Sequence, residues 1–222
     1  MGKVMEKGDR VWLVAMVSLC FGLGRVLATP SVDGALTFLQ VLLGLVCLQL
    51  PYFLRFVARF RIPTLLSVVY LLFIWASTFL GEVCGFYYRY PGFDDMLHLL
   101  SSAMMGIFGF SLFDMLSGGE SEGHRALRAL FAFALALSVG CLWEVYEFTL
   151  DGLLGLNMQK HSYPFGDGLA PLLGREALVD TMKDICIDCL GAGLASLSGY
   201  LILRFGRHWP KALRVGIEPR RG

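Results

Sequence analysis

Hydrophobic residues gather in six long runs separated by short polar segments. The runs cover roughly 11 to 28, 34 to 54, 63 to 86, 93 to 116, 126 to 150 and 180 to 204. A helix needs about 20 apolar residues to cross the hydrocarbon core of a bilayer, and each run approaches that length. The pattern predicts an all-α fold: a polytopic membrane helical bundle of about six transmembrane helices, forming a single integral membrane domain over residues 1–222.

The first run allows a second interpretation. Basic residues precede it, and Val26 and Ala28 before Thr29 fit the small-residue rule for signal-peptide cleavage. Its apolar stretch is long for a signal peptide and contains Arg25. We therefore expect a retained first helix, with a cleaved signal peptide as the alternative.

Composition agrees with a membrane protein. The chain is 56% hydrophobic and 17% charged, and its mean hydropathy is +0.63. A net charge of +1, with the basic residues scattered between apolar runs, gives no reason to expect nucleic acid as a partner. All six cysteines lie in apolar runs and are interpreted as small buried hydrophobes.

The distribution of basic residues predicts the orientation. Lysines and arginines cluster before run one, between runs two and three, between runs four and five, and after run six, so all four clusters fall on one side. The positive-inside rule places that side, with both termini, in the cytoplasm. The long connection 151–179 is then an outer loop, and its many glycines and prolines predict irregular backbone.

Acidic residues enter the bundle from the outer side. Asp180, Asp184 and Asp188 recur at every fourth position, so on a helix they form one stripe. A carboxylate in a membrane span costs several kcal/mol unless something compensates it. The stripe predicts either a cation site or a proton pathway. Protonation, or pairing with Lys183 or Arg175, would be a purely structural alternative.

Two further motifs face the same region. Asp94 and Asp95 lie four and three residues before His98, so either acid can share a helix face with the imidazole. Together they can bind a divalent metal or serve in acid–base chemistry, although a helix cap and a packed histidine would give the same spacing. Glu144 and Glu147 share a face of the fifth run, and Glu82 lies near the outer end of the third.

These motifs also carry a family resemblance. Phe93-Asp94-Asp95 with His98, Trp143-Glu144 with Glu147, and Asp180-Thr181-Met182 with Asp184 and Asp188 resemble the YjdF-like bacterial inner-membrane proteins, and more distantly the VanZ-like group. The resemblance implies a multi-pass protein of the bacterial cytoplasmic (inner) membrane, in a family mostly without an assigned reaction. The VanZ-like name carries an association with glycopeptide resistance at the cell envelope. Asp188 and Met96 depart from the VanZ-like pattern, so the YjdF-like group fits better.

The leading functional hypothesis is metal-assisted hydrolysis or group transfer on a lipid or lipid-linked envelope substrate. It assigns the membrane lipid as partner, names no protein partner, and requires a divalent metal cation as cofactor. The candidate catalytic residues are His98, Glu144 and Glu147. The candidate metal ligands are Asp94, Asp95, His98, Glu144, Glu147, Asp180, Asp184 and Asp188, with Asp188 expected behind the others. Lys160, His161 and Arg175 are candidates for contacting an anionic head group.

Two alternatives remain open at this stage. A cation or proton transporter would need polar residues that continue to the cytoplasmic side, and the inner halves of runs five and six are nearly all apolar. A structural or accessory membrane protein would use the same acids only to hold helices together in a buried polar network.

Overall fold

The computed structural model describes residues 2–28, 32–118, 124–165, 168–206 and 208–218. Its long helices are α1 (Gly2–Ala28), α2 (Val32–Cys47), α3 (Leu50–Ala58), α4 (Thr64–Trp75), α6 (Phe93–Leu116), α7 (Arg125–Leu154) and α8 (Val179–Arg204). Five helical segments are long and apolar enough to span a membrane, and the bent pair of α2 and α3 makes a sixth. The predicted all-α membrane bundle is confirmed.

The second span is bent where the sequence suggested one straight helix. α2 and α3 meet at an angle of 41°. Pro51 lies in the first turn of α3, and its ring would clash with the carbonyl of residue 47, where α2 ends. The Cys47 carbonyl instead accepts a hydrogen bond from the Tyr70 hydroxyl at 2.9 Å. The proline therefore divides the span, and α4 binds the backbone group that is released.

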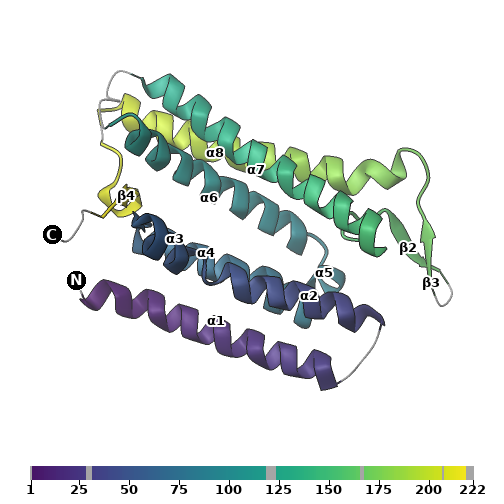
Figure 1. Ribbon diagram of the computed structural model, residues 1–222. Coiled ribbons are helices and arrows are strands. Elements are labelled where there is room, and N and C mark those ends of the chain that lie inside the picture. The colour runs from purple at the N-terminus through teal and green to yellow at the C-terminus, as the bar shows by residue number, and fades with distance from the viewer. Residues whose placement is uncertain (1, 29–31, 119–123, 166–167, 207, 219–222) are drawn as a thin grey trace.

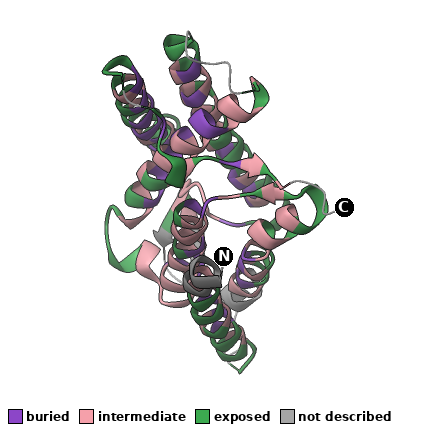
Figure 2. Cartoon of the chain, turned by 90° about the vertical axis from the view of Figure 1, so that its left-hand side faces the viewer, coloured by how far each residue is buried: buried purple, intermediate pink, exposed green. Residues whose placement is uncertain are grey.

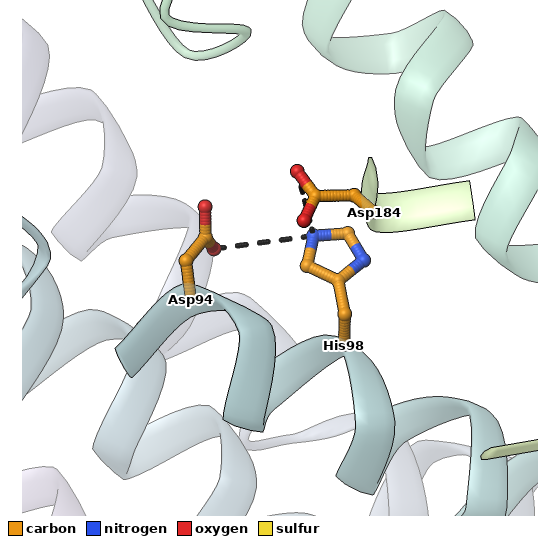
Figure 3. A group of neighbouring side chains, drawn as sticks. All are labelled: Asp94, His98 and Asp184. Carbon is orange, nitrogen blue, oxygen red and sulfur yellow. Dashed lines mark ion pairs between the residues drawn. The ribbon is translucent and has the colours of Figure 1, made fainter. Parts of the chain in front are cut away.

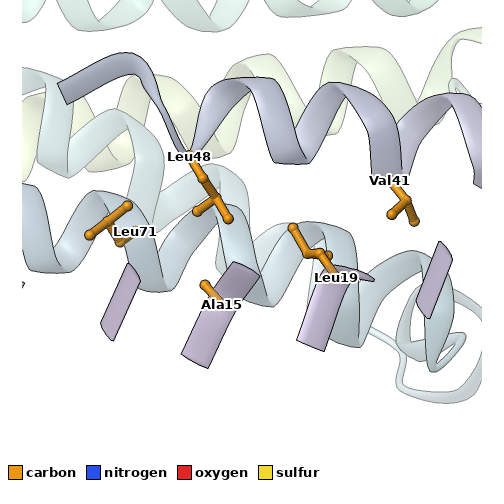
Figure 4. Packing of buried hydrophobic residues seen from close by; sticks show 5 residues of the cluster. All are labelled: Ala15, Leu19, Val41, Leu48 and Leu71. Carbon is orange, nitrogen blue, oxygen red and sulfur yellow. The ribbon is translucent and has the colours of Figure 1, made fainter. Parts of the chain in front are cut away.

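The helices form two groups, seen one above the other in Figure 1. α1, α2 and α4 pack around Ala15, Leu19, Val41, Leu48 and Leu71 (Figure 4). α4 continues without a break into a π-helix, η1 (Ala76–Val83). α6, α7 and α8 pack against one another along most of their length. Exposed residues lie on the outward sides of both groups (Figure 2). Many of them are large and apolar, as expected for a surface that a bilayer would meet.

Small residues bring α6, α7 and α8 close together. A Cβ on Gly191 would lie 2.1 Å from the Ser102 hydroxyl, and one on Gly199 would lie 2.4 Å from the Phe110 ring. Gly191 thus allows the two helices to approach closely. Gly193 does not, because its nearest neighbour would be a Phe133 ring atom at 4.0 Å.

The two groups are joined at the end of the molecule where both termini lie (Figure 1), called here the tail end. Strand β1 (Phe60–Arg61) follows α3 and pairs with strand β4 (Gly216–Ile217) near the C-terminus. A 3₁₀ turn, η4 (Lys211–Leu213), precedes β4, and Trp209 stacks on Phe110 with ring centroids 4.8 Å apart. The C-terminal segment therefore contacts both helix groups.

The opposite end, called here the hairpin end, holds the connection 151–179. The expectation of wholly irregular backbone is wrong in part, because antiparallel strands β2 (Ser162–Phe165) and β3 (Gly168–Pro171) form a hairpin. α7 also runs to Leu154, where Gly155 ends it with φ 68°. A 3₁₀ turn, η3 (Glu176–Leu178), leads into α8, and a short helix, α5 (Phe86–Arg89), joins η1 to α6.

The contrast between Gly199 and Gly193 allows a test of helix packing. Gly199→Ala should destabilise the protein by about 1–3 kcal/mol, because the methyl group must displace the buried Phe110 ring. Gly193→Ala, in the same helix, should be neutral or slightly stabilising, since alanine is the better helix former. Melting temperatures of the detergent-purified variants measure both effects, and equal shifts would contradict the packing described here.

Candidate functional site

The site is built around one buried histidine near the hairpin end of α6. His98 Nδ1 lies 3.3 Å from Asp188 Oδ2 on α8. Its other nitrogen, Nε2, faces three carboxylates: Asp94 Oδ1 at 3.9 Å, Glu144 Oε1 at 3.9 Å and Asp184 Oδ2 at 4.0 Å. Figure 3 shows the Asp94 and Asp184 carboxylates directed at the same imidazole nitrogen. These five residues from α6, α7 and α8 are called the His98 cluster.

Three acids of the cluster are almost completely removed from solvent. The exposed fractions are 4% for Glu144, 2% for Asp184 and 1% for Asp188. Among the described residues, both Glu144 carboxylate oxygens, Asp184 Oδ1 and Asp188 Oδ1 are buried without a hydrogen-bond partner. Because buried polar atoms are nearly always satisfied, these oxygens mark a place where the protein alone does not complete the interactions.

The geometry of the stripe follows from helix periodicity and from one glycine. Asp184 and Asp188 are one turn apart on α8 and both face His98. A Cβ on Gly140 of α7 would lie 2.2 Å from Asp188 Oδ2, so only glycine leaves room for this carboxylate. The sequence pattern predicted the stripe, but no signal in the apolar run around Gly140 indicated what approaches it.

Lys160 pairs with two acids on the hairpin-end side of the cluster. Its Nζ is 2.5 Å from Asp94 Oδ2 and 3.0 Å from Asp180 Oδ1. Burial acts to lower the pKa of Lys160, but the charges and hydrogen bonds of these two carboxylates outweigh burial and raise the pKa above its usual value. Lys160 therefore carries a positive charge. Asp180, the third acid of the stripe, pairs with this lysine instead of facing His98.

A network of side-chain hydrogen bonds holds residues 157–162, called here the strap. Asp151 accepts bonds from the backbone N–H groups of Met158 at 2.8 Å and Gln159 at 3.0 Å. The Asn157 amide exchanges two bonds with the backbone of Ser162, at 2.8 and 2.9 Å. The end of α7 therefore fixes the strap directly.

The strap also contacts α8. Gln159 donates a hydrogen bond to the Thr181 hydroxyl at 2.8 Å and approaches the Glu144 carbonyl at 3.4 Å. Thr181 is not among the site residues that the sequence predicts, because a threonine at a helix start is typical of an ordinary helix end.

The remaining candidate residues lie outside the cluster. Asp95 pairs with Lys183 at 2.5 Å instead of sharing the face of His98. Glu147 is buried and accepts a bond from the Trp143 indole at 2.8 Å. His161 lies 3.3 Å from Asp151, and Arg175 is exposed just before η3.

The other helix group brings further polar residues toward this region. Glu82, in the π-helix η1, accepts a hydrogen bond from Gln40 at 2.9 Å. Tyr87, in α5, has a pKa raised well above its usual range by burial and by the charges of Glu82, Asp94 and Glu147. The three carboxylates therefore lie within electrostatic reach of one phenol, and π-helical segments often occur at functional sites.

Comparison with known proteins agrees with this architecture. Helices of this length and hydropathy, in this number, define an integral protein that crosses the membrane several times. Residues 10–205 match the family described as "Predicted membrane protein (DUF2238)", and the chain belongs to that family. It is 28% identical over 142 residues to a Thermotoga maritima protein named "Uncharacterized protein". That match spans 64% of this chain and 65% of the relative. No solved structure matches.

The role of Asp151 can be tested through the strap. Asp151→Ala removes the acceptor for the Met158 and Gln159 amides, and bonds to a charged acceptor are worth about 1.5–3 kcal/mol. These two amide hydrogens should therefore exchange at least about tenfold faster in hydrogen–deuterium exchange, while amides in α6 stay protected. Glu176→Ala, which removes an exposed acid from the same connection, should leave exchange in the strap unchanged. Unchanged exchange in Asp151→Ala would show that the strap does not depend on this carboxylate.

Proposed function

We propose that the His98 cluster binds a divalent metal ion. The observation that carries this proposal is the arrangement around the imidazole, with Nδ1 on Asp188 and Nε2 facing three carboxylate oxygens. Metal-binding histidines commonly donate the hydrogen of their second nitrogen to a carboxylate, which fixes the tautomer and the ring. If Nδ1 carries the hydrogen here, the Nε2 lone pair points at the other acids.

The spacing of the cluster suits a metal after small side-chain movements. Asp94, His98 and Asp184 each offer a ligand atom, and these atoms lie within 4.8 Å of one another. Tetrahedral ligands at about 2.1 Å from a metal would be about 3.4 Å apart. The oxygens at 3.9 to 4.0 Å from Nε2 would therefore need to move about half an ångström closer to it, and those of Asp94 and Asp184 up to about 1.4 Å closer to each other, which rotation about the side-chain bonds supplies.

Charge balance also supports a bound cation. The His98 cluster and the two lysine pairs beside it contain six carboxylates and three basic groups, so ionised carboxylates would outnumber the basic groups by three. The carboxylates are Asp94, Asp95, Glu144, Asp180, Asp184 and Asp188, and the basic groups are His98, Lys160 and Lys183. A buried polar network without an ion would be expected to satisfy its own members, and four buried carboxylate oxygens of the cluster have no hydrogen-bond partner among the described residues.

A transport pathway is less well supported. On the tail side of the cluster, the described parts of α6, α7 and α8 pack Phe110, Ala132 and Leu203 together with Trp209. A cation that left the cluster in that direction would meet this apolar packing, and the carboxylate at the tail end of α6, Asp114, is already paired with Arg128. A site that holds an ion in place fits this packing better than a continuous path.

The reaction that fits this site best is metal-assisted hydrolysis or group transfer on a lipid or lipid-linked envelope substrate. A divalent ion would polarise the reacting group. Glu144 or Glu147 would take the proton from water or an acceptor hydroxyl. His98 would act as a ligand positioned by Asp188. Lys160, His161 and Arg175 lie on the connection at the hairpin end, where an anionic head group would arrive.

The proposed location follows from the basic residues and from the resemblance to YjdF-like and VanZ-like proteins. The tail end carries the arginines and lysines of four segments, so it would face the cytoplasm with both termini. The His98 cluster would then lie in the outer part of the bacterial inner membrane, within reach of lipids that carry envelope precursors.

Metal content tests the first half of the proposal. The detergent-purified protein should contain about one divalent metal ion per chain by mass spectrometry, and folded Asp184→Asn and His98→Ala variants should lose it. Asp95→Asn should retain the metal, because Asp95 pairs with Lys183 outside the cluster. Circular dichroism and size-exclusion chromatography establish that each variant is folded. If the native protein contains no metal and does not bind added Mn²⁺, the proposed metal site is refuted.

Lipid turnover tests the second half. The protein would be reconstituted into vesicles made from a bacterial inner-membrane lipid extract and incubated with Mn²⁺ or Mg²⁺. Mass spectrometry should detect loss of one lipid species and appearance of its product, slowed at least about 100-fold with Asp184→Asn. An unchanged lipid profile from a protein that does bind metal would leave the ion with a structural role and refute the enzymatic part.

A further inference from the structure

Lys160 holds a position between two acids that a small cation could fill. Its Nζ contacts Asp94 Oδ2 at 2.5 Å and Asp180 Oδ1 at 3.0 Å. Asp94 at the same time directs its other oxygen, Oδ1, toward His98 Nε2. The Asp94 carboxylate therefore contacts the Lys160 ammonium through Oδ2 and faces the centre of the His98 cluster through Oδ1.

The backbone around Lys160 is built to hold it in that place. Lys160 has φ 46°, in the left-handed region that glycine or asparagine adopts more easily. The Gln159 N–H donates a hydrogen bond to Asp151 and the Ser162 N–H donates one to Asn157, so the chain is tied on both sides of Lys160. Because the backbone conformation at this position does not favour lysine, the ion pairs of its side chain explain why lysine is present.

We propose that Lys160 is a tethered counter-ion of the metal site. Its ammonium neutralises Asp94 and Asp180 while the divalent ion is absent, and ion binding displaces it from Asp94 toward solvent. This inference rests on the proposed metal site and adds to it a means of regulation. Metal binding would thereby expose the Lys160 ammonium at the outer surface, where it could bind an arriving anion.

Electrostatics determines whether the Lys160 ammonium strengthens or weakens metal binding. A dication and an ammonium held about 6 Å apart repel each other enough to change a binding constant about tenfold even at the dielectric constant of water. Lys160 could also help to orient Asp94, and losing such a partner would weaken metal binding. Asp94, however, lies in α6 one helical turn from His98, so the helix already fixes its direction. Repulsion therefore dominates, and removing the ammonium should strengthen binding.

The test compares two lysines that form similar contacts. Lys160→Met and Lys183→Met each remove one ammonium from the same end of the bundle, and Lys183 contacts Asp95 at 2.5 Å without touching the His98 cluster. Mn²⁺ binding to the full-length, detergent-purified protein, followed by electron paramagnetic resonance, should be at least about tenfold tighter in Lys160→Met. It should change by less than about threefold in Lys183→Met. Lys160→Arg, which keeps the charge, should bind like the native protein.

A second measurement follows the ammonium itself. Acetylation of Lys160 by an amine-reactive reagent, quantified by peptide mass spectrometry, should accelerate on addition of Mn²⁺, while acetylation of Lys183 should not. Weaker or unchanged Mn²⁺ binding in folded Lys160→Met, an equal gain in Lys183→Met, or Mn²⁺-independent acetylation would each overturn the tethered counter-ion. A protein that binds no Mn²⁺ in native or Lys160→Met form would instead refute the metal site, so the two failures are distinguishable.

Discussion

The contact between His98 and Asp188 is the interaction on which the site depends. Asp188 is 1% exposed, and its Oδ2 lies against the imidazole within the space that Gly140 leaves open. A carboxylate at that depth is tolerable only with a partner, and the imidazole supplies one. By occupying Nδ1, Asp188 also turns Nε2 toward Asp94, Glu144 and Asp184, so one buried pair determines the direction of the whole cluster.

The two helix groups have different roles in the structure. α6, α7 and α8 supply every residue of the His98 cluster and hold it with small-residue contacts that leave little freedom for helix movement. α1, α2 and α4 contribute an apolar core with exposed outer faces, and bring Glu82 and Tyr87 toward the site through the π-helix and α5. A bilayer would surround both groups, so the polar residues between them would sit in a setting where water is scarce and electrostatic interactions are strong.

Much of this fold could be predicted because a membrane imposes a simple rule on sequence. Segments that span it must be apolar and helical, so the six runs and their acids were visible without coordinates. Periodicity also placed Asp184 and Asp188 on one face. What periodicity could not give was the pairing between helices: Asp95 and His98 satisfy the same spacing as Asp94 and His98, yet Asp95 turns to Lys183. The role of Gly140 depends on a side chain from another helix, and no local pattern encodes that.

The pairing of β1 with β4 also bears on how the chain assembles. β1 lies between the second and third spans, whereas β4 follows the sixth, so the pair joins residues about 155 positions apart. Glu218 reinforces it through Arg55 at 2.9 Å and the Arg59 carbonyl at 2.9 Å. During synthesis the early helices enter the membrane well before β4 exists. The pairing of β1 with β4 is therefore a late event in biogenesis, and before it forms a nascent chain relies on contacts such as those of α4 with α6 to hold its two helix groups together.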